Sequence, residues 1–335
     1  MRNWILLFLL FPVSAIAQQP VRNLVFEGAG IRGIAYAGAI QELERRHILQ
    51  EVQRVGGTSA GAITALAVSL GYTSQEISSL IAQTPFKKFN EGRFLFFGGI
   101  NRLKKAYGWY RSTRVDGWIG RLIAAKTGHT NSTFLQLKEA GFKDLYVTAT
   151  CLNKQSLTVF SWETYPHMPV KDAVRISMSI PLYFEAVFID SIGTVISRPK
   201  NKAGLDVMVD GGFIANFPIK LFDSTRFIDA PLPNSFVPNP QTIGFRIDSD
   251  AQIESDKTPG HLAAMSIESL NNYFVAFYTI ILENLNRQSL TKADWQRTVS
   301  ISDSTIAPRI RKLATSEIKK LTTAGATATA AFFSR

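Results

Sequence analysis

The chain has 335 residues, enough for one large domain or two of ordinary size, and 46% of them are hydrophobic, which suffices for a packed core. A single cysteine, Cys151, excludes an intrachain disulfide. The net charge of +11 suits an anionic partner, and because no nucleic-acid-binding motif accompanies it, we expect an anionic membrane surface and no nucleic acid.

Residues 1–17 have the pattern of a signal peptide. Arg2 supplies the positive start, an apolar run extends from Trp4 to Phe11, and Ala15-Ile16-Ala17 is a cleavage site of the A-x-A type. The run is shorter than the roughly 20 residues that span a bilayer. The alternative is a buried N-terminal strand. We expect an exported protein (periplasmic, outer-membrane-associated or secreted) whose mature chain, residues 18–335, carries a charge of +10 and forms a single domain.

The remaining sequence alternates between strand and helix patterns. A strand over 21–27 and a helix over 33–47 are followed by a strand over 51–55 and a helix over 60–71, so a strand–turn–helix unit occurs twice. The pattern then predicts helices over 74–83 and 113–127, strands over 144–151 and 156–161, a helix over 169–178, and strands over 206–209 and 242–247. The C-terminal part, 258–335, is expected to be helical, with one long helix over 261–287 and another after about residue 313. This alternation predicts an α/β fold with a central, largely parallel sheet.

The second of these units carries a nucleophile motif. Gly57-Thr58-Ser59-Ala60-Gly61 fits G-x-S-x-G between a strand and a helix, the setting in which a serine is exposed on a sharp turn. Gly57 and Gly61 are small enough to let strand and helix approach each other. The following helix N-terminus favours negative charge developing beside the serine. An ordinary glycine-rich turn is the alternative.

The first unit carries a glycine-rich loop, Gly28-Ala29-Gly30-Ile31-Arg32-Gly33. Its G-x-G-x-x-G spacing suits dinucleotide binding, and its backbone N–H groups equally suit an oxyanion. Dinucleotide binding calls for an acidic residue at the end of the second strand. Glu51 lies before that strand instead. We therefore favour the oxyanion site, with a purely structural turn as the other alternative.

A base for the serine is less obvious. Asp210-Gly211-Gly212 follows a short apolar strand, although an Asp-Gly pair alone is often only a turn. The chain has four histidines, of which His261 follows Ser59 and Asp210 in the chain order of an α/β-hydrolase triad. Both Asp210 alone and Asp210 with His261 are therefore kept as hypotheses.

Together these blocks resemble the patatin-like phospholipases. The glycine-rich loop, the serine motif and Asp210-Gly211-Gly212 occur in that order, and Ala173 to Pro181 and Asn216-Phe217-Pro218 are also similar to the family. The resemblance extends over about 22–223.

The resemblance implies a three-layer α/β/α sandwich akin to cytosolic phospholipase A2 and a Ser59–Asp210 dyad without histidine. It also implies acyl transfer from phospholipids or related lipids. Gly28, Ala29, Gly30 and Gly33 would form the oxyanion loop, braced by Arg32, with Gly211 and Gly212 as supporting residues. Ala29 stands where the family usually has glycine, which would cost about 1 kcal/mol if that position needs a positive φ. A non-catalytic lipid- or nucleotide-binding protein of the same fold is the remaining alternative.

Membrane contact is predicted over 85–114, where aromatic and basic residues alternate. They are Phe86, Lys87, Lys88, Phe89, Phe94, Phe96, Phe97, Lys104, Lys105, Trp109, Tyr110, Arg111 and Arg114. Core helices with solvated basic faces are the alternative. Asp248-Ser249-Asp250 is typical of a turn after a strand, so we expect no metal and no cofactor.

Overall fold

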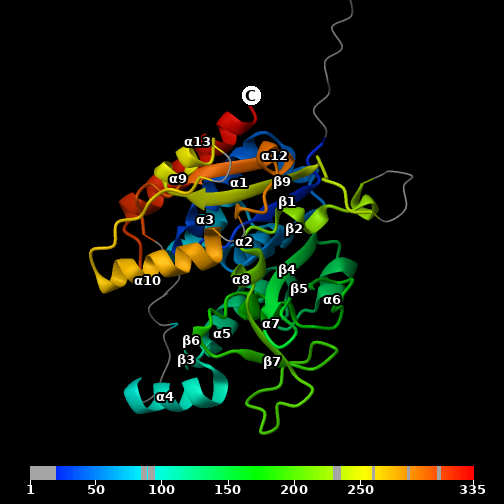
Figure 1. Cartoon of the computed structure of the whole chain (residues 1–335). Coiled ribbons are helices and arrows are strands. Elements are labelled where there is room, and N and C mark those ends of the chain that lie inside the picture. The colour runs from blue at the N-terminus through cyan, green and yellow to red at the C-terminus, as the bar shows by residue number, and fades with distance from the viewer. Residues whose placement is uncertain are drawn as a thin grey trace, which may run out of the picture.

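A computed structural model describes residues 20–83, 89, 95–228, 235–258, 261–284, 287–307 and 311–335. The predicted signal peptide, 1–17, lies outside the described residues. Figure 1 shows a central sheet with helices packed around it, and a smaller part of the chain around α4, β3 and β6 at one end.

The central sheet has the strand order β10-β9-β1-β2-β4-β8-β7, with β5 also paired to β4. Its strands are β1 (Asn23–Phe26), β2 (Arg54–Gly57), β4 (Asp144–Cys151), β5 (Ser156–Phe160), β7 (Val187–Ile189), β8 (Asp206–Asp210), β9 (Thr242–Asp248) and β10 (Thr298–Ser302). Pairings from β10 through β4 are parallel, whereas β8, β7 and β5 pair antiparallel. The predicted α/β fold is confirmed, and the sheet is mixed because its β8–β7 side is antiparallel. A separate pair is formed by β3 (Gly108–Tyr110) and β6 (Leu182–Phe184).

The helices connect these strands. They are α1 (Ala35–Arg45), α2 (Ala60–Ser69), α3 (Ser74–Gln83), α4 (Leu95–Ala106), α5 (Thr113–Thr127), α6 (Phe134–Glu139), α7 (Val170–Ser177), α8 (Gly212–Ala215), α9 (Asp250–Ser255), α10 (Leu270–Tyr278), α12 (Lys292–Gln296) and α13 (Thr315–Phe332). Short 3-10 turns are η1 (Gly30–Ile34), η2 (Ile48–Gln50), η4 (Ile219–Phe222) and η5 (Thr225–Phe227), and η6 (Thr279–Asn284) is a π-helical turn.

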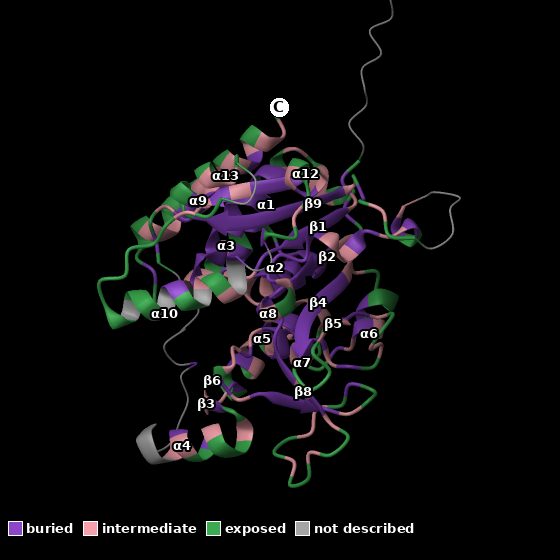
Figure 2. Ribbon diagram, viewed as in Figure 1, coloured by how far each residue is buried: buried purple, intermediate pink, exposed green. Residues whose placement is uncertain are grey.

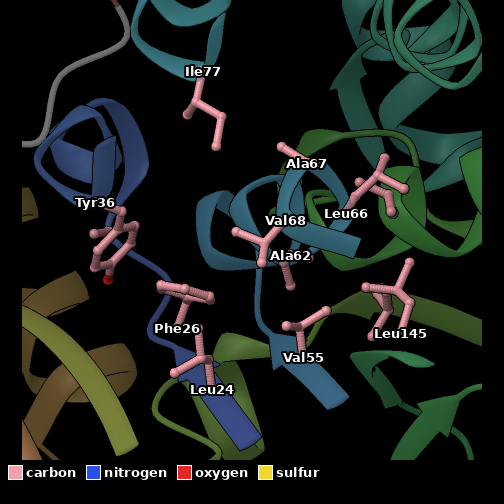
Figure 3. Close-up of a cluster of buried hydrophobic side chains, with 14 of the residues drawn as sticks. Leu24, Phe26, Tyr36, Val55, Ala62, Leu66, Ala67, Val68, Ile77 and Leu145 are labelled. Atoms are coloured by element: carbon pink, nitrogen blue, oxygen red, sulfur yellow. The ribbon is translucent and has the colours of Figure 1, made fainter. Parts of the chain in front are cut away.

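The two faces of the sheet are covered unequally. Alternate residues of a strand point to opposite faces, and Leu24 and Phe26 of β1 join the larger core beneath α1 and α2 (Figure 3). Val25, between them, packs with Tyr146 and Phe222 on the other face. That second layer is thin there, because it consists of the 3-10 turns η4 and η5. Figure 2 shows the central strands β1 and β9 buried along their length, with exposed residues on the outer sides of the helices.

The last helix belongs to the same packed body as the first. α13 contacts both α1 and β10. A Cβ at Gly38 of α1 would lie 1.8 Å from the Thr322 carbonyl oxygen, so only glycine permits this helix spacing. The predicted C-terminal helix is therefore confirmed. The helix predicted over 261–287 is wrong in its first part: residues 261–268 are not helical, and α10 begins at Leu270.

β4 is the strand on which the two halves of the sheet meet. Val147 pairs with both β2 and β5, which therefore lie on opposite edges of β4. Thr150 pairs with both β5 and β8, which places β8 on the edge that β2 occupies. β2 and β8 thus run towards each other along one edge. The last residue of β2, Gly57, pairs with Val147. The last residue of β8, Asp210, pairs with Ala149. The ends of the two strands are separated only by the position of Thr148.

Candidate active site

Ser59 lies in the turn between β2 and α2, in a conformation that few serines adopt. Its φ of 52° and ψ of −118° fall outside the regions that L-residues favour. A Cβ at Gly61 would lie 2.2 Å from the Phe26 carbonyl oxygen, and one at Gly57 would lie 2.4 Å from the Gly61 carbonyl oxygen. The two glycines are therefore required for the close approach of strand and helix. The predicted nucleophile turn is present, with Ser59 partly exposed at its apex.

Asp210 ends β8 directly opposite this turn. Its side chain is buried, with 3% of the residue exposed. Burial raises the pKa of the Asp210 carboxyl to about 7, against the opposing effects of hydrogen bonds from the Gly212 N–H and the Ser59 side chain. The Gly212 N–H donates to Oδ1 over 2.8 Å. A carboxyl group that changes charge near neutral pH therefore lies next to the serine hydroxyl.

Thr148, at the junction of the two strands, ties both sides together. Its hydroxyl is 2.5 Å from that of Thr58, and the Thr58 hydroxyl donates to the Ala215 carbonyl oxygen over 2.7 Å. A Cβ at Gly211 would lie 2.7 Å from the Thr148 carbonyl oxygen. Gly211 therefore lets the chain after Asp210 pass close to β4, which accounts for glycine at this position.

The segment that ends α7 contacts both Ser59 and Asp210. The Ser59 N–H donates to Oγ of Ser177 over 2.8 Å, and the Asp210 N–H donates to the Ser179 carbonyl oxygen over 2.9 Å. The Ser179 hydroxyl in turn donates to the Arg175 carbonyl oxygen over 2.8 Å. Sequence reasoning identified 173–181 only through a resemblance and missed these contacts. The only local indication of these contacts was the pair of serines, Ser177 and Ser179, at the end of the predicted helix.

The glycine-rich loop lies against Ser59. A Cβ at Gly28 would lie 3.3 Å from Cβ of Ser59. The Gly28 N–H, however, donates to the Asn216 carbonyl oxygen over 3.0 Å, so this predicted oxyanion donor is already engaged. The side chain of Asn216 donates back to the Gly28 carbonyl oxygen over 2.9 Å. Asn216 therefore fixes the loop to the segment that follows Asp210, a role that the sequence alone did not assign.

The rest of the loop leaves N–H groups available. η1 begins at Gly30, and the first N–H groups of a helix have no partner within it. Gly30 has a φ of +55° and is exposed, whereas Ala29 has a φ of −132°. The strain considered for alanine at this position does not arise, because the left-handed residue is Gly30. Gly33 is buried, and a Cβ there would lie 3.2 Å from Cβ of Ala60 at the start of α2.

Arg32, which the sequence led us to expect as a brace for the loop, connects the loop to Asp303 after β10. It is buried, its Nε lies 3.4 Å from the Ala29 carbonyl oxygen, and Nη1 is 3.6 Å from the Asp303 carboxylate. Near this ion pair, the ends of β1 and β9 carry a buried set of charged side chains. It comprises Glu27, Arg246, Asp248, Asp256 and Arg287.

Asp248, considered above for a metal, pairs with the guanidinium groups of Arg246 and Arg287. Within the described part of the chain, no three histidine, cysteine or carboxylate side chains are grouped to hold a metal ion. The buried charges thus serve the loop and the strand ends through ion pairs.

Among the described residues, no hydrogen bond joins a histidine side chain to Ser59 or Asp210. His47, His129, His167 and His261 are all exposed, whereas Asp210 is buried and contacts Ser59 itself. In a triad the imidazole would lie between the serine and the acid. The exposure of His261 therefore favours Asp210 acting without a histidine over the triad through His261.

The segment predicted to contact membranes, 85–114, is only partly described. Phe86, Lys87, Lys88 and Phe94 lie outside the described residues. Phe89 is buried against the main core, so it is not a headgroup contact. Lys104, Lys105 and Arg114 are exposed. Among the described helices, none combines the length and the apolar character that crossing a bilayer requires.

Comparison with known proteins agrees with this geometry. Residues 24–223, which include the glycine-rich loop, Ser59 and Asp210, match the model of the patatin-like phospholipases. The chain belongs to the patatin-like phospholipase family. Membership of this family places it among the lipid acyl hydrolases.

Curated relatives cover about the same part. The chain is 34% identical over 213 residues to the uncharacterized protein YqhO of Bacillus subtilis, matching 60% of this chain and 67% of YqhO. It is 25% identical over 201 residues to protein 463L of invertebrate iridescent virus 6, named a probable lipid hydrolase, matching 60% of this chain and 62% of that protein. The chain thus spans about two thirds of the length of these relatives.

Among solved structures, VipD from Legionella pneumophila superposes with a TM-score of 0.55 at 14% identity, over 94% of this chain and 67% of VipD. At this identity the match concerns the fold, and it agrees with an α/β sheet flanked by helices.

Proposed function

We propose that this patatin-like phospholipase cleaves fatty-acyl esters of phospholipids through a dyad of Ser59 and Asp210. The observation that carries the proposal is the buried carboxyl of Asp210, with its pKa raised to about 7, beside a serine on a strained turn. A carboxylate of ordinary pKa is a weak base, and desolvation strengthens it where the serine proton must go.

The reaction proceeds by acyl transfer. Oγ of Ser59 attacks the ester carbonyl carbon while its proton passes to Asp210. The tetrahedral intermediate collapses, and the departing alcohol takes the proton back, which leaves an acyl-serine. Water then attacks this ester while Asp210 accepts its proton, and Asp210 passes that proton to Oγ of Ser59 as the fatty acid leaves.

Backbone N–H groups of the glycine-rich loop stabilise the negative oxygen of each tetrahedral intermediate. The Gly28 N–H already donates to the Asn216 carbonyl oxygen. The N–H groups of Ala29 and Gly30 are therefore the oxyanion donors in this proposal. One such donor is typically worth about 2.7–4 kcal/mol. The start of α2 at Ala60 adds the positive end of a helix beside the same point.

The lipid surface is proposed to contact α10 and η6. Leu270, Tyr273, Phe277 and Ile280 recur every three or four residues, and each is at least half exposed, from 50% to 72%. Apolar side chains at this spacing share one face of a helix. η6 contacts α8, which begins two residues after Asp210, so the end of this helical segment lies near the strand end that carries Asp210. Exposed apolar side chains of this kind suit the boundary between headgroups and acyl chains.

Mass spectrometry of lipid products tests the hydrolysis itself. Wild type and Ser59→Ala are incubated with mixed phospholipid vesicles, and free fatty acids and lysolipids are measured. Loss of a nucleophile costs on the order of 10⁴-fold or more, so products should vanish in the variant. Activity within tenfold of wild type would exclude Ser59. Absence of products from wild type on every lipid and on a soluble ester would favour a non-catalytic lipid- or nucleotide-binding protein.

Export is part of the same proposal. Arg2, the apolar run and Ala15-Ile16-Ala17 support removal of residues 1–17 by a signal peptidase. The intact mass of the protein recovered from its native host tests this. A mature chain beginning at Gln18 is expected, and a chain that retains Met1 in a cell-envelope fraction would oppose it.

A further inference from the structure

A cavity whose lining does not include Ser59 lies beside the C-terminal end of α4. It has a volume of about 840 Å³ and is bounded by α4, the start of α5, β7 and the loop over 195–202. The basic side chains that line it are Arg102, Lys104, Lys105, Arg111, Arg175, Arg198, Lys200 and Lys202. Glu185 is the one acidic residue of the lining. The cavity therefore holds a large excess of positive charge.

Most of these cations have no carboxylate partner among the described residues. Among the described residues, no ion pair involves Arg102, Arg111 or Arg198, whereas Arg175 pairs with Asp116 and Asp172. Like charges brought this close repel one another, so eight basic side chains beside the single carboxyl group of Glu185 favour an anionic partner from outside the chain.

Arg102 gives the clearest evidence of a built site. The residue is buried, with 7% exposed, and its Nε donates to the Trp109 carbonyl oxygen over 2.7 Å. Its Nη2 is buried and reaches no acceptor within the described part of the chain. Nε of Arg111 is in the same situation. Buried donors are almost always satisfied in native proteins, so two buried guanidinium donors at one cavity call for an acceptor that the chain does not supply.

Glu185 does not supply it. Its carboxyl group is half-buried, and burial raises its pKa although Arg198, Arg111, Arg102 and Arg175 all act to lower it. It forms no ion pair among the described residues with any of them. The carboxyl group of Glu185 therefore repels an incoming anion when it is ionised. Removing its charge should raise the affinity of the cavity for an anion.

We propose that this cavity binds a phosphate-bearing ligand, held by Arg102, Arg111 and Arg198. Guanidinium groups bind phosphate oxygens in a bidentate geometry and remain charged at any physiological pH. The volume exceeds what a single phosphate needs and falls within the range of small-molecule sites. Either a phospholipid headgroup or a soluble phosphorylated molecule carries this chemistry.

The cavity is also joined to the reacting residues by α7. Arg175 lines it, and the same helix end supplies Ser177 to Ser59 and Ser179 to Asp210. If the proposed function holds, an occupied cavity restrains the end of α7 and increases hydrolysis of a soluble ester. If the ligand binds without changing the rate of ester hydrolysis, only this coupling is refuted. Ligand binding and ester hydrolysis are each tested by a separate measurement.

Isothermal titration calorimetry tests binding. The purified mature protein is titrated with inorganic pyrophosphate and, separately, with a short-chain, water-soluble phosphatidylglycerol. The double variant Arg111→Gln/Arg198→Gln should lose tenfold or more in affinity, since hydrogen bonds to charged groups are lost. The control Lys319→Gln/Lys320→Gln removes the same charge from exposed positions of α13 and should change the affinity less than twofold.

Glu185→Gln guards against misinterpreting a misfolded variant. It removes the opposing carboxyl group and should raise the affinity several-fold, an effect that unfolding cannot imitate. Binding of the lipid but not of pyrophosphate identifies a headgroup, and the reverse identifies a soluble ligand. No binding of either probe to wild type, or equal losses in the pocket and control variants, would overturn the proposal.

Discussion

The backbone N–H of Ser59 donates to Oγ of Ser177 over 2.8 Å, across 118 positions of sequence. Ser59 has a positive φ, and its side chain does not cap α2. The hydrogen bond from its backbone N–H to Ser177 therefore helps to hold this strained residue in place. A buried N–H that loses its acceptor costs about 1–3 kcal/mol. The strained turn is thus held by a helix end that takes no direct part in the chemistry.

Ser177→Ala should therefore lower kcat on a soluble ester by about tenfold, since 1.4 kcal/mol corresponds to that factor, and leave KM nearly unchanged. Ser69→Ala is the matched control. That buried hydroxyl donates to the Lys143 carbonyl oxygen over 2.6 Å, away from the reacting pair. Steady-state kinetics and thermal unfolding of both variants check the prediction. Equal kcat losses in the two variants would show that Ser177 acts only through stability.

Asp210→Asn removes the proposed base and keeps its shape, so activity should fall by about 10³-fold or more. His261→Ala should change the rate by less than about threefold, because His261 is exposed. The esterase rate of each purified variant is measured, with circular dichroism to confirm folding. A collapse of activity in His261→Ala would contradict the dyad.

The pH dependence of kcat/KM follows from the same carboxyl group. Asp210 accepts a proton only when it is ionised, and its pKa is raised to about 7. The rate on a soluble ester should therefore rise with pH, about tenfold per unit below the pKa, and level off above it. A profile that is flat between pH 5 and pH 8 would exclude Asp210 as the base.

Stability should change with pH in the opposite direction. The folded-state pKa of Asp210, about 7, exceeds the ordinary value of 3.8, so the folded protein binds more protons between these values. Its contribution to the free energy of unfolding is fully present below about pH 4 and is lost as pH rises through 7. Ionised Asp210 then costs up to about 4 kcal/mol.

Asp210→Asn carries no such charge. Its melting temperature should exceed that of wild type at pH 8, by a margin larger than at pH 5. Differential scanning calorimetry at both values tests this. If Asp210→Asn is less stable than wild type at pH 8, the surroundings of Asp210 stabilise its ionised form, and the prediction is wrong.

The exposed apolar face of α10 gives a prediction about substrates in membranes. Leu270→Ser/Phe277→Ser should reduce hydrolysis of vesicle phospholipid several-fold and leave the rate on a soluble ester within twofold. Ile192→Ser/Phe236→Ser is the control, because these side chains are 73% and 64% exposed elsewhere. Equal effects of the two double variants on vesicles would refute a specific role for α10.

Sequence patterns predicted the turns, helices and strands whose formation depends on residues adjacent in the sequence. The turn at Ser59, with Gly57 and Gly61, was expected because strand, turn and helix follow one another in the sequence. The ends of α3, α5 and β4 match the predicted ranges for the same reason.

What the sequence did not predict depends on partners far along the chain. Ser177 binds Ser59, and Asn216 engages Gly28, through contacts that no local periodicity records. The non-helical segment 261–268 was assigned to a helix because apolar residues there have helical spacing, although Met265 and Ile267 are exposed in the structure. The basic stretch predicted to contact membranes included Lys104, Lys105 and Arg111, but local patterns could not show that Arg175 and residues 198–202 fold against it.

The meeting of β2 and β8 on one edge of β4 has a consequence for how this chain can vary. The register on β4 fixes the spacing between the serine and the acid, whereas almost 150 residues of chain separate Gly57 from Asp206. Lengthening or replacing a surface loop in that interval leaves the register untouched, since loops tolerate insertions and strand pairing does not. Recognition features such as the cavity beside α4 can therefore diverge freely between relatives, while a one-residue shift along β4 would separate the reacting pair.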